Sequence, residues 1–189
     1  RRQRQMCIRD RYYIVALLDD ESYKSIEPLQ RNIARKYRLS RSNSTFHIPL
    51  SVIDNPNMDK FDEIISNILK PYKTFKVELG STLFSDENAK TFSLEIENKG
   101  YIRRLSRIMN DTLKLHGFSV RDIETENSMY VALNNINSVS KDLNKAYNNL
   151  SPNVKMIKIN RIELWKSTGG KKEFIIKSYP LKNLSLIHI

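Results

Sequence analysis

The chain has 189 residues and carries 32 lysines and arginines against 21 aspartates and glutamates, which gives a net charge of +11. Its length fits one domain with a sizeable core, and no apolar run approaches the roughly 20 residues that span a bilayer, so we expect a soluble protein without a membrane partner. A single cysteine excludes a disulfide framework and a cysteine-rich zinc site. The excess of basic residues favours a polyanionic partner such as RNA.

The two ends of the chain look unlike the rest. The segment RRQRQMCIRDR at the start and the final LSLIHI resemble translated sequencing-adapter sequence. We therefore expect 1–11 and 183–189 to be non-native, the native N-terminus to be missing, and 12–182 to form one domain. The alternative is a native basic arm and a native apolar tail. Without the five arginines and one aspartate of 1–11, the net charge falls from +11 to +7, and the only thiol, Cys7, is lost.

The first half of the chain predicts alternating strands and helices. YYIVALL at 12–18 is rich in β-branched and aromatic residues, which favour strands. A helical region follows over 19–40, strongest from Pro28 onward because proline suits the first turn of a helix. TFHIPLSV at 45–52 is the next strand. The apolar periodicity then predicts a helix at 55–72 and short strands at 73–79, 81–84 and 91–97.

The second half predicts the same kinds of element. An amphipathic helix is expected at 101–115, with Gly117 as its C-terminal cap and His116 in a capping role beside it. The remaining elements are a strand at 128–136, a helix at 139–150, and a C-terminal hairpin of strands at 154–166 and 173–181.

The two halves contain a weak internal repeat. HIPL at 47–50 and YVAL at 130–133 each read as a reactive residue, an aliphatic residue, a small residue and leucine, 83 positions apart, and each is followed by a predicted helix. A duplicated strand-and-helix unit would relate the two strands by a pseudo-twofold axis. Since alternate side chains of a strand share a face, we expect the two reactive faces to meet across a cleft.

Several segments together resemble the two-histidine (2H) phosphoesterases, and most closely the eukaryotic U6 small nuclear RNA phosphodiesterases. They are FHIPLS, ENAKTFSLEI, YIRRLSRIMNDTLKLHGF, MYVALNNI, KINRIELWKS and KKEFIIKSYPLK, and the resemblance covers nearly all of 12–182. It implies an α+β fold of two pseudo-twofold lobes, in which two small antiparallel sheets flank a central cleft and helices lie outside.

The resemblance also implies a chemistry that needs neither a metal nor a cofactor. In each of two His-x-Ser/Thr motifs, the histidine acts as acid or base, because the imidazole pKa lies near 6.5. One takes the proton of the ribose 2′-OH and the other protonates the departing 5′ oxygen. The hydroxyls bind the phosphate oxygens as charge develops.

Three of the four motif positions depart from that pattern. His47 is intact, but Pro49 stands at the first Ser/Thr position, Tyr130 at the second histidine, and Ala132 at the second Ser/Thr. Proline and alanine offer no side-chain donor. Tyrosine donates a proton but is a poor base near neutrality. We therefore expect His47 as base and Tyr130 as acid, if the chain is an enzyme.

Other side chains are expected to line the cleft. Ser51 should share a face with His47 and Pro49, and Asn134 should share one with Tyr130, so each could contact a displaced phosphate, although an ordinary polar role at a strand end is the alternative. Lys90 and Thr91 belong to the family-like KTF step and are expected to bind substrate. Trp165 is expected to be a packing residue.

Three functional hypotheses remain open. The first is an RNA 3′-end phosphodiesterase, a 3′–5′ exoribonuclease that trims the uridine tail of U6 small nuclear RNA slowly or by an altered acid–base pair. The second is a non-catalytic relative that keeps the cleft to bind RNA or a protein. The third is a decaying gene. The resemblance implies a single-stranded, uridine-rich RNA 3′ end as partner and a nuclear location, and we expect a monomer.

Overall fold

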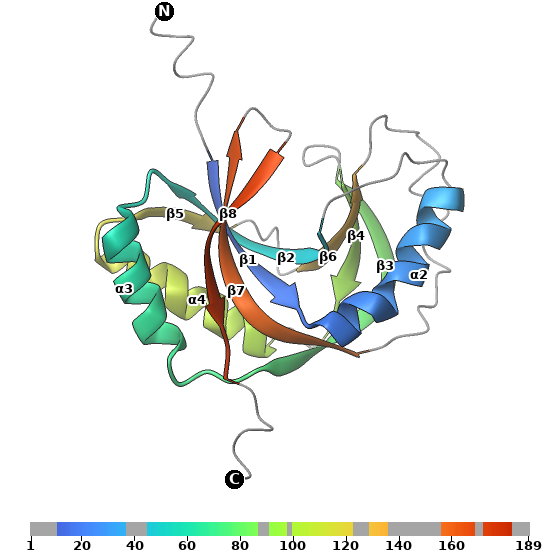
Figure 1. Ribbon diagram of the computed structural model, residues 1–189, viewed down its shortest axis with the longest axis horizontal. Helices are drawn as coiled ribbons and strands as arrows, with labels where there is room; N and C mark the ends of the chain where they lie inside the picture. The colour runs from blue at the N-terminus through green and yellow to red at the C-terminus, as the bar shows by residue number, and fades with distance from the viewer. Residues whose placement is uncertain are drawn as a thin grey trace, which may run out of the picture.

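The computed structural model describes residues 11–36, 45–86, 91–97, 100–122, 129–135, 156–168 and 172–182. This part of the chain contains three helices and eight strands, and Figure 1 shows how they are arranged. Their bounds are β1 Arg11–Leu18, α2 Asp20–Lys36, β2 His47–Asp54, α3 Met58–Leu69, β3 Phe75–Asp86, β4 Thr91–Ile96, α4 Gly100–Leu115, β5 Ser119–Asp122, β6 Tyr130–Asn135, β7 Met156–Thr168 and β8 Lys172–Pro180.

The eight strands form one antiparallel sheet that closes on itself. Its order is β1-β2-β6-β4-β3-β7-β8, β5 pairs with β2, and an additional pairing of β1 with β7 closes a ring. Helices α3 and α4 lie together at one end of the molecule in Figure 1, and α2 lies at the other end. This arrangement confirms the predicted α+β class.

The predicted pair of small sheets is joined into one sheet by two long strands that serve both lobes. The start of β2 pairs with β6 at His47, whereas its end, Ser51–Asp54, pairs with β5. In the same way β7 pairs with β3 over Met156–Ile159 and with β8 over Arg161–Thr168. A strand of this length exposes enough backbone donors and acceptors to pair with two partners in succession.

Three elements differ from the prediction. Helix α2 begins at Asp20 and contains Pro28 in its interior, at the cost of one backbone hydrogen bond. Burial of Ile26 and Ile33, each 1% exposed, holds the helix on the sheet in spite of that loss. The two short strands expected around Gly80 form one strand, β3, and β5 was not predicted. The helix predicted at 139–150 lies outside the described residues.

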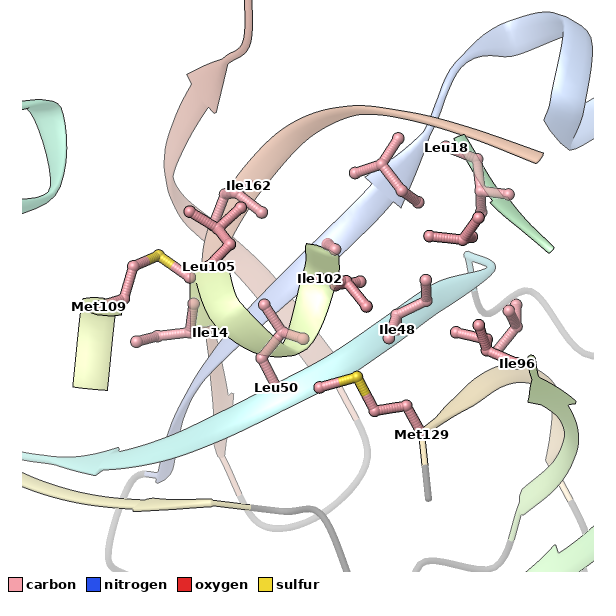
Figure 2. Close-up of a cluster of buried hydrophobic side chains, with 14 of the residues drawn as sticks. Ile14, Leu18, Ile48, Leu50, Ile96, Ile102, Leu105, Met109, Met129 and Ile162 are labelled. Atoms are coloured by element: carbon pink, nitrogen blue, oxygen red, sulfur yellow. The ribbon is translucent and has the colours of Figure 1, made fainter. Parts of the chain in front are cut away.

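A large part of the core lies between the sheet and helix α4. Figure 2 shows Ile102, Leu105 and Met109 of α4 packed over Ile14 and Leu50 of the sheet, and none of the five is more than 1% exposed. Side chains that alternate with this set point to the opposite side of the sheet. We call that opposite side the His47 face, and it carries Tyr13, Val15, Leu17, His47, Pro49, Ser93, Tyr130, Ala132, Glu163 and Trp165.

Helix α4 ends as the sequence predicted. Gly117 has a φ of +89°, which a residue with a Cβ adopts with strain. The N–H of Gly117 donates to the carbonyl of Lys114, and that of Phe118 to the carbonyl of Leu113, which is the Schellman pattern. His116 contributes Nδ1 to a 2.8 Å hydrogen bond with the carbonyl of Thr112, so its predicted capping role is confirmed. No helix in the described residues is long and apolar enough to cross a membrane.

Candidate functional site

The two motif strands are hydrogen-bonded neighbours. His47 in β2 lies opposite Ala132 in β6, and the strands run antiparallel. Tyr130 stands two residues along β6 from Ala132, on the same face, so it is a diagonal neighbour of His47, roughly 7–8 Å away across the strand pair. The two motif strands therefore lie side by side, and both motifs stand on one face of the sheet.

The imidazole of His47 is arranged to accept a proton. It is half-buried, and its Nδ1 lies 2.7 Å from the carbonyl oxygen of Thr45, which can only accept, so Nδ1 carries the hydrogen. Burial lowers the pKa of His47 below its usual 6.5, and the bond to Thr45 opposes this only in part. The neutral ring then presents the lone pair of Nε2, which accepts no hydrogen bond from the described residues.

This lowered pKa predicts a pH-dependent stability. The unfolded chain binds a proton at His47 more readily than the folded chain does. Above about pH 6.5 this proton therefore costs no stability, and the free energy of unfolding should fall as the pH drops below that value. Thermal unfolding of the unchanged chain and of His47→Gln from about pH 7.5 to about pH 5 checks this. The variant should lose less stability on acidification, and equal losses would contradict a lowered pKa.

Neither position that the family pattern assigns to a phosphate-binding hydroxyl provides a donor. Pro49 is half-buried and pairs with Val15 of β1, and Ala132 is 7% exposed. A proline has no backbone N–H either, so the β2 position offers a phosphate oxygen nothing to accept from. Tyr130 is half-buried beside them and brings a phenolic hydroxyl to this part of the face.

Trp165 of β7 packs against the ring of His47. The ring centroids are 4.5 Å apart at an interplanar angle of 54°. Trp165 is 4% exposed and forms a small apolar cluster with Val15 and Leu17. The expected packing role of Trp165 is confirmed, but its contact with His47 was not predicted. The contact depends on β1 lying between β2 and β7, which the sequence of β7 alone does not indicate.

A buried carboxylate holds Trp165 in place. Glu163 is 4% exposed, and its Oε1 accepts a 2.8 Å hydrogen bond from the indole Nε1 of Trp165. Its Oε2 accepts from the Nε of Arg161 at 3.0 Å and from the hydroxyl of Ser178 at 3.1 Å. Arg161 also donates from Nη1 to the carbonyl of Leu18. Arg161, Glu163 and Trp165 stand at every second position of β7, and alternate residues of a strand share a face. This alternation was the signal in the sequence that the three side chains lie side by side.

Ser51 does not belong to this face. It is 0% exposed, and its hydroxyl donates a 2.6 Å hydrogen bond to Oδ1 of Asn110 in helix α4, on the core side of the sheet. The prediction that Ser51 shares a face with His47 and Pro49 is therefore wrong, and Ser51 is not a ligand of a phosphate bound there.

A β-bulge explains the position of Ser51. In the β1–β2 pairing Ile14 lies opposite Ser51 and the next residue, Val15, lies opposite Pro49, so Leu50 is an extra residue in β2. An extra residue changes the phase of the alternation by one position. Leu50 and Ser51 consequently both point to the core, which strict alternation from His47 onward does not predict.

The bond from Ser51 to Asn110 predicts a structural effect of mutating Ser51. Ser51→Ala should lower the free energy of unfolding by about 1 kcal/mol, because one buried hydrogen bond is lost, and should leave RNA binding unchanged. Urea unfolding and a parallel RNA-binding titration measure the two effects. Weakened binding at unchanged stability would return Ser51 to the site.

The remaining predicted substrate-binding residues are only partly described. Lys90 lies outside the described residues. Thr91 opens β4 opposite Asn135, and Asn134 in β6 lies opposite Phe92, but the structure describes only the backbone at these positions. Their proposed contacts with substrate stay predictions. Within the described ranges, no group of three or more histidine, cysteine, aspartate or glutamate side chains is placed to hold a metal ion.

Solved structures share this fold. E. coli LigT, solved with 3′-AMP, has a TM-score of 0.59 at 12% identity, over 92% of this chain and 98% of LigT. TT0787 of Thermus thermophilus has a TM-score of 0.59 at 13% identity, over 92% and 99% of the two chains. Kluyveromyces marxianus Usb1 has a TM-score of 0.51 at 10% identity, over 93% and 100%.

These likenesses show that the chain has the α+β fold of the 2H phosphoesterases, with nearly the whole of each protein matched. At such low identity they show the fold alone. No protein-family model and no curated protein matches the chain.

Proposed function

We propose that this protein is a 2H phosphoesterase of the U6 type, which binds the 3′ end of single-stranded, uridine-rich RNA and cleaves its terminal phosphodiester slowly and without a metal. The observation that carries the proposal is the imidazole of His47, whose Nδ1–H is held by the carbonyl of Thr45 and whose pKa is lowered by burial. Such a ring is neutral at pH 7 and is ready to act as a base.

In the proposed reaction His47 and Tyr130 act on opposite sides of the phosphorus. Nε2 of His47 takes the proton of the ribose 2′-OH, and the 2′ oxygen bonds to the adjacent phosphorus. The bond from phosphorus to the 5′ oxygen of the last nucleoside breaks, and the phenol of Tyr130 gives that oxygen its proton. The RNA keeps a 2′,3′-cyclic phosphate, and a nucleoside with a free 5′-OH leaves.

The reaction is slow because charge on the phosphate is poorly stabilised. Pro49 and Ala132 replace the two hydroxyls that the family pattern places beside the phosphate, and the loss of one such donor typically lowers kcat by about 100-fold to 1,000-fold. The same two residues favour a second candidate function, a relative that binds RNA 3′ ends without cleaving them. The proposal also includes a monomer and, on the resemblance to the U6 enzymes alone, a nuclear location.

The test is cleavage of a 3′-labelled RNA with an oligouridine tail, in EDTA, by the unchanged chain and by His47→Ala. His116→Ala is the matched control, since His116 is exposed, lies outside the two motif strands and bonds through its ring to Thr112 at the end of α4. Slow cleavage that His47→Ala abolishes and His116→Ala preserves is the expected result. Binding without cleavage in all three proteins would favour the non-catalytic function, and the absence of binding would overturn the proposal.

A further inference from the structure

Ser93 of β4 lies in the same row as His47. Ala132 in β6 is the cross-strand partner of His47 on one side and of Ser93 on the other. Side chains of directly opposed residues point to the same face of a sheet. The row across β2, β6 and β4 therefore reads His47, Ala132, Ser93, with adjacent strands about 4.8 Å apart.

The hydroxyl of Ser93 has no partner in the described part of the protein. Its sequence neighbours Leu94 and Ile96 are 0% exposed in the core, so Ser93 points to the opposite side, onto the His47 face. Ser93 is only 6% exposed, yet no hydrogen bond joins its hydroxyl to a described residue. Because this hydroxyl keeps some contact with solvent, it is free to donate to an oxygen of a bound ligand.

Ala132 places only a methyl group between His47 and Ser93. Its side chain is a single methyl group, where the family pattern has a hydroxyl that would face the same row. In the neighbouring row, Glu95 lies opposite Tyr130 and brings a carboxylate to that position. Because like charges repel, an anion is better placed in the row of His47, Ala132 and Ser93 than in the row of Tyr130 and Glu95.

We propose that Ser93 binds a phosphoryl oxygen of the RNA and so replaces the hydroxyl that position 132 lacks. The phosphate then lies above the methyl group of Ala132, between Nε2 of His47 and the hydroxyl of Ser93. This inference rests on the proposed function, because it assigns a new contact to the same phosphate.

The experiment compares two ligands, uridine 3′-monophosphate and uridine, by isothermal titration calorimetry with the whole chain. Ser93→Ala should bind the monophosphate about tenfold more weakly and uridine equally well, because a hydrogen bond to a charged oxygen is lost. Ser93→Thr keeps a hydroxyl on the same strand position and should bind as the unchanged chain does. Ser119→Ala removes an exposed serine of β5 that bonds to Asp54, and it is the matched control.

The decisive variant removes the hydroxyl from position 93 in β4 and places one at position 132 in the neighbouring strand β6. Ser93→Ala combined with Ala132→Ser should recover the monophosphate affinity that Ser93→Ala loses, since both hydroxyls face one phosphate. Unchanged affinity in folded Ser93→Ala would overturn the role of Ser93 and leave the proposed function standing. If the unchanged chain binds neither monophosphate nor oligouridine-tailed RNA, the proposed function and this inference both fail.

Discussion

The variant Pro49→Ser/Tyr130→His/Ala132→Ser is expected to cleave an oligouridine-tailed RNA in EDTA at least about 100-fold faster than the unchanged chain. The two strands already present these positions on one face, with Ala132 directly opposite His47. Each substitution therefore adds a functional group without requiring a new backbone path. The new imidazole at position 130 is a better proton donor near neutrality than a phenol, and the two hydroxyls supply the missing phosphate contacts.

The control for this restoration is the same variant with His47→Ala added, which should return cleavage to background. Single substitutions show which loss matters most, and Ala132→Ser is the smallest change of the three. A folded triple variant that binds RNA without cleaving it would mean that the His47 face does not hold a scissile phosphate, and the enzymatic part of the proposed function would be withdrawn.

A large effect on stability is expected at Glu163. Glu163→Ala should lower the free energy of unfolding by about 2–3 kcal/mol, because Trp165 and Ser178 lose the acceptor of their hydrogen bonds and Arg161 loses one of its acceptors. The expected loss is smaller than for a fully buried ion pair, since the side chain of Arg161 is 31% exposed and water can replace part of the interaction.

Trp165 reports this change directly, because it is the only tryptophan of the chain. Its fluorescence should shift toward that of a more exposed indole in Glu163→Ala, along with the loss in urea unfolding. Glu163→Gln keeps a carbonyl oxygen that can accept from the indole, so its stability and fluorescence should lie between those of the unchanged chain and Glu163→Ala. Cleavage should also decline in Glu163→Ala, since Trp165 packs on His47. Unchanged stability of Glu163→Ala would show that the hydrogen bonds of Glu163 do not support the fold.

Much of the fold followed from local patterns in the sequence. Apolar periodicity placed helix α4, and Gly117 marked the end of that helix because the left-handed backbone there favours glycine. Alternation within β2 correctly put His47 and Pro49 on a face away from Ile48. Helix α2 was harder, because proline signals a helix start locally, whereas burial of its apolar side chains keeps Pro28 inside.

For the candidate site as well, some features followed from the sequence and others only from the tertiary structure. The sequence by itself determined which residue types stand in the two motif strands, and hence that a base and a phenol are present while two hydroxyls are absent. Only the tertiary structure decided that Ser51 points into the core, that Trp165 lies on His47, and that Ser93 joins the row of His47. The direction of a side chain depends on its own strand, but its neighbours depend on bulges and on the pairing register between segments far apart in the chain, which no local pattern encodes.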